Sequence, residues 1–239
     1  MNKIIIGALC ALAGAANADI ITQWNFNSVP ADGNVATGTL TPSIGSGTAS
    51  GVGGVNATAF ASGDANGGST DPLVTSSTTS DSGWQVTTFA AQNTGNLERG
   101  VQFLVSTVGF QDIIVTFDQR HSNTSSRFYA GQYTVDGGTN WITAVTFEGN
   151  AGDTWFNGRT IDLSSVTATD NNANFGIRVV AAFATGTNAY VASSGTATYA
   201  AAGTARFDMM TVAGSAVPAP GSVALVAVGG LMVARRRRN

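Results

Sequence analysis

The chain has 239 residues, of which 43% are hydrophobic and only 10% are charged. Five of its eleven basic residues are Lys3 and the four arginines at positions 235–238, so residues 19–214 carry fourteen acids against six arginines, a net charge of −8. Phosphate backbones are bound through clustered lysine and arginine, so this composition argues against nucleic acid as a partner. The only cysteine is Cys10, which leaves the rest of the chain without disulfides or a thiol nucleophile.

The N-terminal residues have the three parts of a secretory signal. Lys3 supplies a positive charge, Ile4 to Gly14 an apolar segment, and Ala16-Asn17-Ala18 a small-residue cleavage motif. Cleavage between Ala18 and Asp19 would remove residues 1–18, including Cys10. We therefore expect an exported protein whose mature chain begins at Asp19.

The body of the chain, residues 19–214, has the composition of strands joined by glycine turns. Lysine is absent from it and glutamate is rare, which disfavours helices. A first strand is predicted over Asp19 to Asn27, with four side chains alternating onto one face. These are Ile20, Thr22, Trp24 and Phe26.

Residues 33–82 form a tract of Gly, Ser, Thr and Ala with few large side chains. Val52, Val55 and Phe60 indicate that some of the tract packs, so we interpret it as short strands and wide loops. The alternative is that part of the tract is disordered.

From Trp84 onward, apolar residues alternate in short runs separated by glycine or asparagine. The runs are Val101 to Val105, Ile113 to Phe117, Tyr129 to Val135, Trp141 to Phe147, Ile161 to Val166, Ile177 to Phe183 and Arg206 to Val212. No amphipathic helix and no fixed repeat period interrupts them. The pattern predicts an all-β fold, a single antiparallel β-sandwich or jelly-roll domain.

Thr134-Val135-Asp136-Gly137-Gly138-Thr139-Asn140-Trp141 matches the Asp-box pattern of secreted β proteins. The spacing serves a turn, because Asp136 can accept backbone N–H groups, the glycines allow positive φ, and Trp141 can cover the hairpin. A single copy does not indicate a sialidase, so we interpret the motif as structural.

Two places offer oxygen ligands for calcium. Asp170-Asn171-Asn172-Ala173-Asn174 has oxygen donors at alternate positions, but the glycine and glutamate that complete an EF-hand loop are missing, so a solvated turn is the better interpretation. Asp208, in the last predicted strand, resembles the terminal-strand aspartate with which exported jelly-roll modules can bind a structural calcium; the resemblance implies Asn25 or Asn27 of the first strand as further ligands. The alternative is that Asp208 faces outward on an edge strand.

The sequence selects no catalytic group. His121 is the only histidine, so a multi-histidine metal centre is impossible, and no Gly-x-Ser-x-Gly motif presents a nucleophile. We expect Asp118, Arg120 and His121 to form a local polar cluster. Paired carboxylates for glycoside hydrolysis have no local signature. Exposed aromatic side chains could stack on sugars or, alternatively, fill the sandwich; the candidates are Trp84, Tyr129, Trp155 and Tyr190.

The C-terminal segment, residues 215–239, has three parts. Val217, Pro218, Ala219 and Pro220 form a short rigid element ending at Gly221, followed by the apolar stretch Ser222 to Ala234. The cluster Arg235, Arg236, Arg237, Arg238 then favours the cytoplasmic side of a membrane. The apolar stretch is short for a permanent span of about 20 residues, so we expect a transient transmembrane helix; an ordinary tail anchor or a buried strand is the alternative.

This tripartite arrangement resembles the PEP-CTERM sorting signal, which an exosortase, a membrane cysteine protease, removes during delivery to the bacterial surface. Ala219 stands where that motif commonly has glutamate. The body resembles uncharacterised exported proteins with this signal in three places: Trp24-Asn25-Phe26, the segment Asp118 to Arg127, and the segment Thr146 to Phe156. The resemblance implies a location and an architecture, and no activity.

The expected function is that of an exported, exosortase-sorted protein without catalytic activity, structural or adhesive, at the cell surface, the outer membrane or in the extracellular matrix. Its expected partners are the sorting protease, the membrane before processing, and extracellular polysaccharide. The first alternative is a lectin-like, carbohydrate-binding module stabilised by calcium. The second is an enzyme that acts on polysaccharide.

Overall fold

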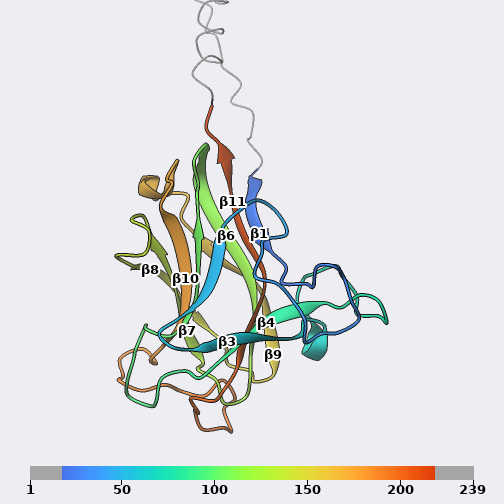
Figure 1. Ribbon diagram of the computed structural model, residues 1–239. Coiled ribbons are helices and arrows are strands. Elements are labelled where there is room, and N and C mark those ends of the chain that lie inside the picture. The colour runs from blue at the N-terminus through green and yellow to red at the C-terminus, as the bar shows by residue number, and fades with distance from the viewer. Residues whose placement is uncertain (1–17, 219–239) are drawn as a thin grey trace, which may run out of the picture.

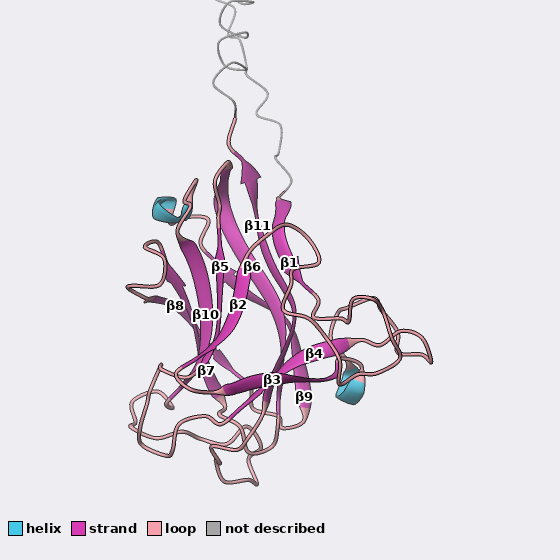
Figure 2. Cartoon of the chain, viewed as in Figure 1, coloured by secondary structure: helices cyan, strands magenta, loops and turns pink. Residues whose placement is uncertain are grey.

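The computed structural model describes residues 18–218, which form two antiparallel β-sheets (Figures 1 and 2). The first sheet has the order β3 (Asn56–Ser62), β4 (Ser82–Thr87), β11 (Ala205–Ala216), β6 (Phe110–His121) and β9 (Thr154–Asp162), and β1 (Asp19–Trp24) also pairs with β11. The second sheet has the order β2 (Thr48–Val52), β5 (Gly100–Val105), β10 (Phe175–Ala182), β7 (Phe128–Thr134) and β8 (Ile142–Glu148). The helices in this part of the chain are single turns, η1 (Ala65–Gly67) and η2 (Thr167–Thr169). The predicted all-β class is confirmed.

Aromatic side chains from both sheets meet in the core. The ring of Trp24 on β1 lies 5.0 Å from that of Phe103 on β5, and Trp84 on β4 contacts the same ring edge-on at 5.9 Å. Phe117 on β6 meets Phe147 on β8 at 5.3 Å. Such pairs contribute about 0.5–1.5 kcal/mol each beyond the apolar area they bury. The two sheets therefore form a sandwich held by its own core, without a disulfide in the described residues.

Strand alternation sends the predicted side chains inward. Val101 and Phe103 are fully buried on β5, as are Ile113 and Val115 on β6. On β1 the prediction fails for Ile20, which is 45% exposed. The pairing of β1 with β11 shifts register between Ile20 and Thr22, and such a bulge reverses the face on which a side chain lies.

The tract of small residues over 33–82 is folded rather than disordered. It contains β2, β3 and η1, and its side chains Val55 and Phe60 pack against the core. Its last part, the segment from Gly63 to Asp81, leaves the edge of the first sheet at the end of β3 and returns to it at β4. We call this segment the 63–81 loop.

Two strands, β4 and β1, pair with successive parts of one edge of β11, and the gap between them positions the carboxylate cluster. Ala205 to Phe207 pair with β4, whereas Met210 to Gly214 pair with β1. On the opposite edge, the pairing with β6 shifts register between Asp208 and Thr211. Asp208 therefore lies at a bulge, in the gap where β4 ends its pairing and β1 begins.

The two ends of the described chain lie next to each other. Asp19 is paired with Gly214, and both ends leave the same end of the sandwich in Figure 1. β11 continues to Ala216, so the folded body runs past the predicted boundary at residue 214. The predicted signal peptide before Ala18 and the sorting segment after Pro218 lie outside the described residues. Within residues 18–218 no helix is long and apolar enough to cross a membrane.

Candidate metal centre

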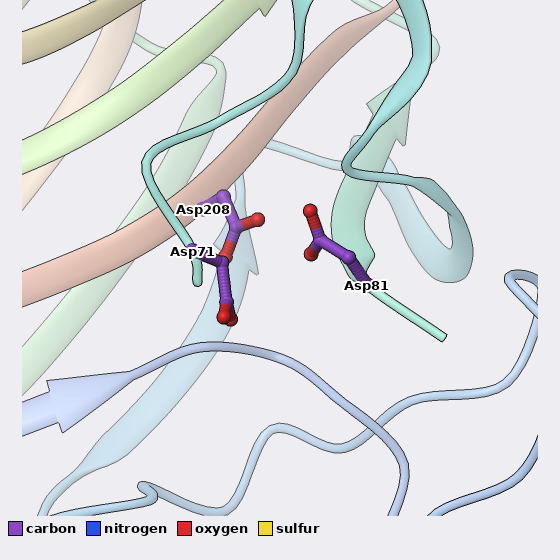
Figure 3. Close-up of side chains that lie close together, drawn as sticks. All are labelled: Asp71, Asp81 and Asp208. Atoms are coloured by element: carbon purple, nitrogen blue, oxygen red, sulfur yellow. The ribbon is translucent and has the colours of Figure 1, made fainter. Parts of the chain in front are cut away.

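Three carboxylates from separate segments converge beside β11. Asp71 and Asp81 come from the 63–81 loop and Asp208 from the bulge of β11, and one oxygen of each lies within 4.8 Å of the others. Figure 3 shows the carboxyl groups of Asp81 and Asp208 directed toward a common space, with Asp71 beside them. Asp208 and Asp81 are 0% and 1% exposed, whereas Asp71 is half-buried.

The backbone at the bulge fixes the side chain of Asp208. Met209 has a positive φ of 47°, an uncommon conformation for a residue with a side chain. Its backbone N–H donates to Asp208 Oδ1 at 2.7 Å. The other oxygen, Oδ2, is buried and has no hydrogen-bond partner.

Asp81 immediately precedes β4 and packs over a glycine. A Cβ atom at Gly63 would collide with the carboxylate of Asp81, so only glycine leaves room for this side chain. Asp81 Oδ2 accepts a hydrogen bond from the Ser69 hydroxyl at 3.3 Å. Its Oδ1 is buried and has no hydrogen-bond partner, like Oδ2 of Asp208.

Asp71 is held by its own loop and by the segment that follows β1. Its Oδ1 accepts the backbone N–H of Leu73 at 2.8 Å, and its Oδ2 accepts Asn27 Nδ2 at 2.8 Å. Asn27 follows β1, and its Oδ1 accepts the backbone N–H of Ser82 at the start of β4. Asn27 thus joins the end of β1, the start of β4 and the 63–81 loop.

The 63–81 loop is fixed to two strands of the first sheet, β6 and β9, by the residues that precede Asp71. Thr70 donates its backbone N–H and its hydroxyl to Asp118 Oδ2 at 2.5 and 2.6 Å. On β9, Trp155 Nε1 donates to Ala65 O at 2.9 Å, and Asn157 Nδ2 donates to Gly68 O at 3.0 Å. These contacts hold Asp71 against the outer side of β11.

Burial and mutual repulsion disfavour ionisation of this cluster. Desolvation, and then the charges of Asp71 and Asp64, raise the pKa of Asp81 to about 7. Desolvation and the neighbouring Asp81 raise the pKa of Asp208 well above its usual range. At neutral pH the site therefore requires protons or a cation to compensate its charge.

The geometry favours ion binding over catalysis. A raised carboxyl pKa is typical of a general acid in a glycosidase. However, Asp81 and Asp208 are covered by the 63–81 loop and are almost completely buried, so a sugar ring has no access to them. Carboxylate and hydroxyl oxygens are ligands of hard divalent cations.

The structure brings only some of the predicted calcium ligands to the carboxylate cluster. Asp208 is a member of the cluster, and Asn27 contacts it through Asp71. Asn25 is not a member, because its Oδ1 accepts the backbone N–H of Asn27 at 3.4 Å and the residue lines a surface pocket. The alternative of an outward-facing Asp208 on an edge strand is wrong as to the strand, because β11 lies between β4 and β6 in the first sheet; the side chain is buried beneath the 63–81 loop.

Sequence reasoning missed Asp71 and Asp81. Both lie in the tract of small residues where no alternation pattern assigns a side chain to a face. The Asp-Pro step at Asp71 was the available signal, and it does not indicate which strand the loop covers.

His121 is sealed inside the sandwich and cannot reach a substrate. It is 0% exposed, and its Nδ1 lies 2.9 Å from Ser126 O while its Nε2 lies 3.1 Å from Arg159 Nη2. A carbonyl can only accept, so Nδ1 carries the proton and Nε2 accepts from the arginine. Desolvation, and then the charge of Arg159, lower the pKa of His121 to about 3, which keeps it neutral.

The predicted cluster of Asp118, Arg120 and His121 does not form. Asp118 accepts hydrogen bonds from the 63–81 loop and, through Oδ1, from the backbone N–H of Gly158 at 2.7 Å. Arg120 instead pairs with Asp153 at 2.7 Å. The three side chains are neighbours in sequence, but each contacts a different part of the fold.

The Asp-box motif forms the predicted turn between β7 and β8. Asp136 Oδ1 accepts the backbone N–H of Asn140 at 2.9 Å, and Gly137 and Gly138 have positive φ of 73° and 93°. Trp141 Nε1 donates to Gly138 O at 3.0 Å and covers the turn. The motif is structural here, as predicted.

The loop from Asp170 to Asn174 is also a turn, as predicted. Asp170 Oδ1 accepts the backbone N–H of Asp112 at 3.0 Å, and Asn171 Oδ1 accepts that of Gly109 at 2.9 Å. Asn172 Nδ2 donates to the backbone carbonyls of Ala168 and Val135, and Asn172 Oδ1 accepts the backbone N–H of Asn174 at 2.6 Å. Two of the side-chain oxygens that resembled calcium ligands, those of Asp170 and Asn172, are thus engaged by the backbone.

The four aromatic residues that could have stacked on sugars are buried. Trp84 and Tyr129 are 0% exposed, Tyr190 is 2% exposed and Trp155 is 7% exposed. They fill the interior, which was the alternative interpretation. Trp141 differs from them because it is half-buried, with the guanidinium carbon of Arg178 4.7 Å from its ring centre.

Comparison with known proteins gives no match to a family model and none to a curated protein. The carboxylate cluster at the bulge of β11 is the place in the described residues where buried ionisable groups converge with unpartnered oxygens.

Proposed function

We propose that this chain is an exported, non-catalytic protein of the cell surface or extracellular matrix, sorted through a PEP-CTERM-like signal by an exosortase-like protease. The observation that carries the proposal is that the described strands lie between the predicted signal cleavage site and the Val217 to Pro220 element. β1 begins at Asp19, directly after the predicted cleavage site. β11 ends at Ala216, directly ahead of the Val217 to Pro220 element. Cleavage after Ala18 and at or beyond the Val217 to Pro220 element would leave every described strand intact.

The two chain ends lie side by side, which suits a jelly-roll type of sandwich that is attached to a membrane at one end. Because Asp19 and Gly214 are paired, both tags would be attached at the same end of the body. During sorting, the apolar stretch from Ser222 to Ala234 would hold that end at the membrane, with Arg235 to Arg238 on the cytoplasmic side. The loops at the opposite end of the body would then face outward.

A structural or adhesive role is supported by the state of the ionisable groups. His121 is buried and engaged at both ring nitrogens. Asp32, Asp136 and Asp162 accept hydrogen bonds that lower their pKa values, chiefly from backbone N–H groups for the first two and from a serine hydroxyl for the third, so they are poor general acids at neutral pH.

Mass spectrometry of the protein recovered from the cell surface tests export and processing together. We expect an N-terminus at Asp19 and loss of the residues that follow the Val217 to Pro220 element. Replacing Arg235 to Arg238 with asparagine should leave the C-terminus unprocessed, whereas the body variant Asp112→Asn should be processed normally. Recovery of the complete, uncleaved chain from the cytosol would contradict the proposal.

A carbohydrate-binding module is the second candidate, and one observation favours it. Five polar residues lie in register across the outer face of the second sheet, one on each strand. They are Ser50, Gln102, Arg178, Gln132 and Thr143. Beside them, the half-buried Trp141 packs on Arg178. Aromatic rings and amide groups together are suited to contact with polysaccharide.

A glycan array with the purified protein distinguishes the two candidates. Saturable binding that is lost in Trp141→Ala and kept in Asp112→Asn would establish the lectin. Glycan turnover that survives purification and is lost when one specific acid is replaced would instead establish an enzyme. The structural role predicts neither result.

A further inference from the structure

We propose that Asp71, Asp81 and Asp208 bind one Ca²⁺ ion, which fastens the 63–81 loop to β11. This inference goes beyond the proposed function and does not depend on it, because it concerns the folded body alone. The site joins a bulge in the last strand, a residue that directly precedes β4, and the middle of a long loop.

Two unpartnered oxygens distinguish this site from an ordinary group of acids. Asp81 Oδ1 and Asp208 Oδ2 are buried, have no hydrogen-bond partner, and belong to residues that are 1% and 0% exposed. A buried acceptor without a donor is destabilising by about 1–3 kcal/mol, and more when it is charged. The second oxygen of each carboxylate is hydrogen-bonded, so the unpartnered atoms are those left free for a ligand.

The ligand set and its spacing favour calcium. Calcium binds oxygen at about 2.3–2.6 Å, so two of its ligands can be up to about 5 Å apart. The three carboxylate oxygens lie within 4.8 Å of one another and therefore fit around one ion. Magnesium binds oxygen at about 2.0–2.1 Å and requires a closer octahedral set. Zinc prefers nitrogen and sulfur ligands, and His121 is engaged elsewhere in the core.

The surrounding hydrogen bonds prepare the carboxylates for an ion. Asn27 and the backbone N–H of Leu73 orient Asp71, while the backbone N–H of Met209 orients Asp208. Hydrogen bonds that orient the ligand side chains are typical of metal sites. Asp71 is half-buried, so an ion and its remaining waters can enter from the solvent side.

Titration of the purified full-length protein with calcium chloride, after treatment with EGTA, tests the proposal. We expect saturable heat at one ion per chain by isothermal calorimetry. At a free calcium concentration 100-fold above Kd, the melting temperature should rise by about 5–10 °C. Magnesium chloride should give a much weaker response at the same concentration.

Isosteric variants locate the ion. Asp208→Asn and Asp81→Asn should each weaken calcium binding by at least 10-fold, whereas Asp112→Asn, an exposed aspartate outside the cluster, should bind as the unaltered protein does. The calorimetric result on the unaltered protein decides the proposal even if a variant does not fold. Absence of heat and of a melting shift, unchanged binding by Asp208→Asn, or equal affinity for magnesium would each overturn it.

Discussion

Replacing Asp81 with asparagine should stabilise the metal-free protein, and the gain should increase as the pH rises from about 4 to about 7. The folded-state pKa of Asp81 is raised from 3.8 to about 7 by burial and by the charges of Asp71 and Asp64. Ionisation is therefore less favourable in the folded chain than in the unfolded chain. The penalty is absent below pH 3.8 and complete above about pH 7.

The magnitude follows from the shift in the pKa of Asp81. At 1.36 kcal/mol per pH unit, moving a pKa from 3.8 to about 7 destabilises the folded protein by at most about 4 kcal/mol. Solvent that reaches the half-buried Asp71 screens part of this repulsion, so we expect an effect of about 2 kcal/mol. Asparagine keeps the shape and removes the charge.

The buried His121 also makes the stability depend on pH, so the free energy of unfolding of Asp81→Asn must be compared with that of the unaltered protein. Its folded-state pKa is lowered from 6.5 to about 3, so the unfolded chain binds the proton more tightly. This effect raises stability as the pH rises from about 3 to 6.5, opposite in sign to the effect of Asp81. His121 is present in both proteins, so its contribution cancels in their difference.

Urea unfolding in EGTA, at intervals between pH 4 and pH 8, measures this difference. The free energy of unfolding of Asp81→Asn minus that of the unaltered protein should become more positive by about 2 kcal/mol across the range. In saturating calcium the sign should reverse, because the variant loses a ligand. Asp112→Asn should show no such trend. A difference that does not change with pH in EGTA would refute the electrostatic reasoning.

Three further predictions concern other parts of the fold. The ring protons of His121 should not titrate between pH 5 and pH 8 in NMR spectra, because desolvation lowers its pKa to about 3; a midpoint near 6.5 would contradict its burial. Gly100→Ala should destabilise the protein by about 1–3 kcal/mol in urea unfolding, because the added Cβ would collide with the backbone oxygen of Val179. In the control Gly195→Ala the added Cβ meets open space, so the free energy of unfolding should change by less than about 0.5 kcal/mol. Asp136→Ala should lower the melting temperature at neutral pH, and the difference should disappear as the pH falls from about 4 to about 2, since the hydrogen bond from the Asn140 backbone lowers the pKa of Asp136 to about 2; a pH-independent difference would contradict this.

The strands were predictable where large apolar side chains alternate with polar ones. The runs that predicted β5 and β6 are Val101 to Val105 and Ile113 to Phe117, in which apolar residues recur at every second position. The predicted burial of Ile20 was wrong because it depends on a bulge, and a bulge depends on how two strands that are distant in sequence pair. The bounds of β9 were also not predicted: the strand runs from Thr154 to Asp162, whereas the predicted run begins at Ile161.

The candidate site was predictable only through Asp208. Its place in the last predicted strand resembles that of a calcium ligand in exported jelly-roll modules, and this resemblance led to the calcium hypothesis. Its partners depend on where a glycine-rich loop folds back, which is decided by contacts such as those of Thr70 with Asp118 and of Trp155 with Ala65. Those contacts join residues far apart in the sequence, so no local pattern identifies Asp71 and Asp81.

A crystal structure of the protein grown with calcium tests the central claim most directly. It should show a single anomalous-scattering peak between Asp71, Asp81 and Asp208, with carboxylate oxygens at about 2.3–2.6 Å. Water molecules should complete the coordination on the solvent side. Carboxyl groups hydrogen-bonded to one another around an ion-free space, in crystals that contain calcium, would contradict it.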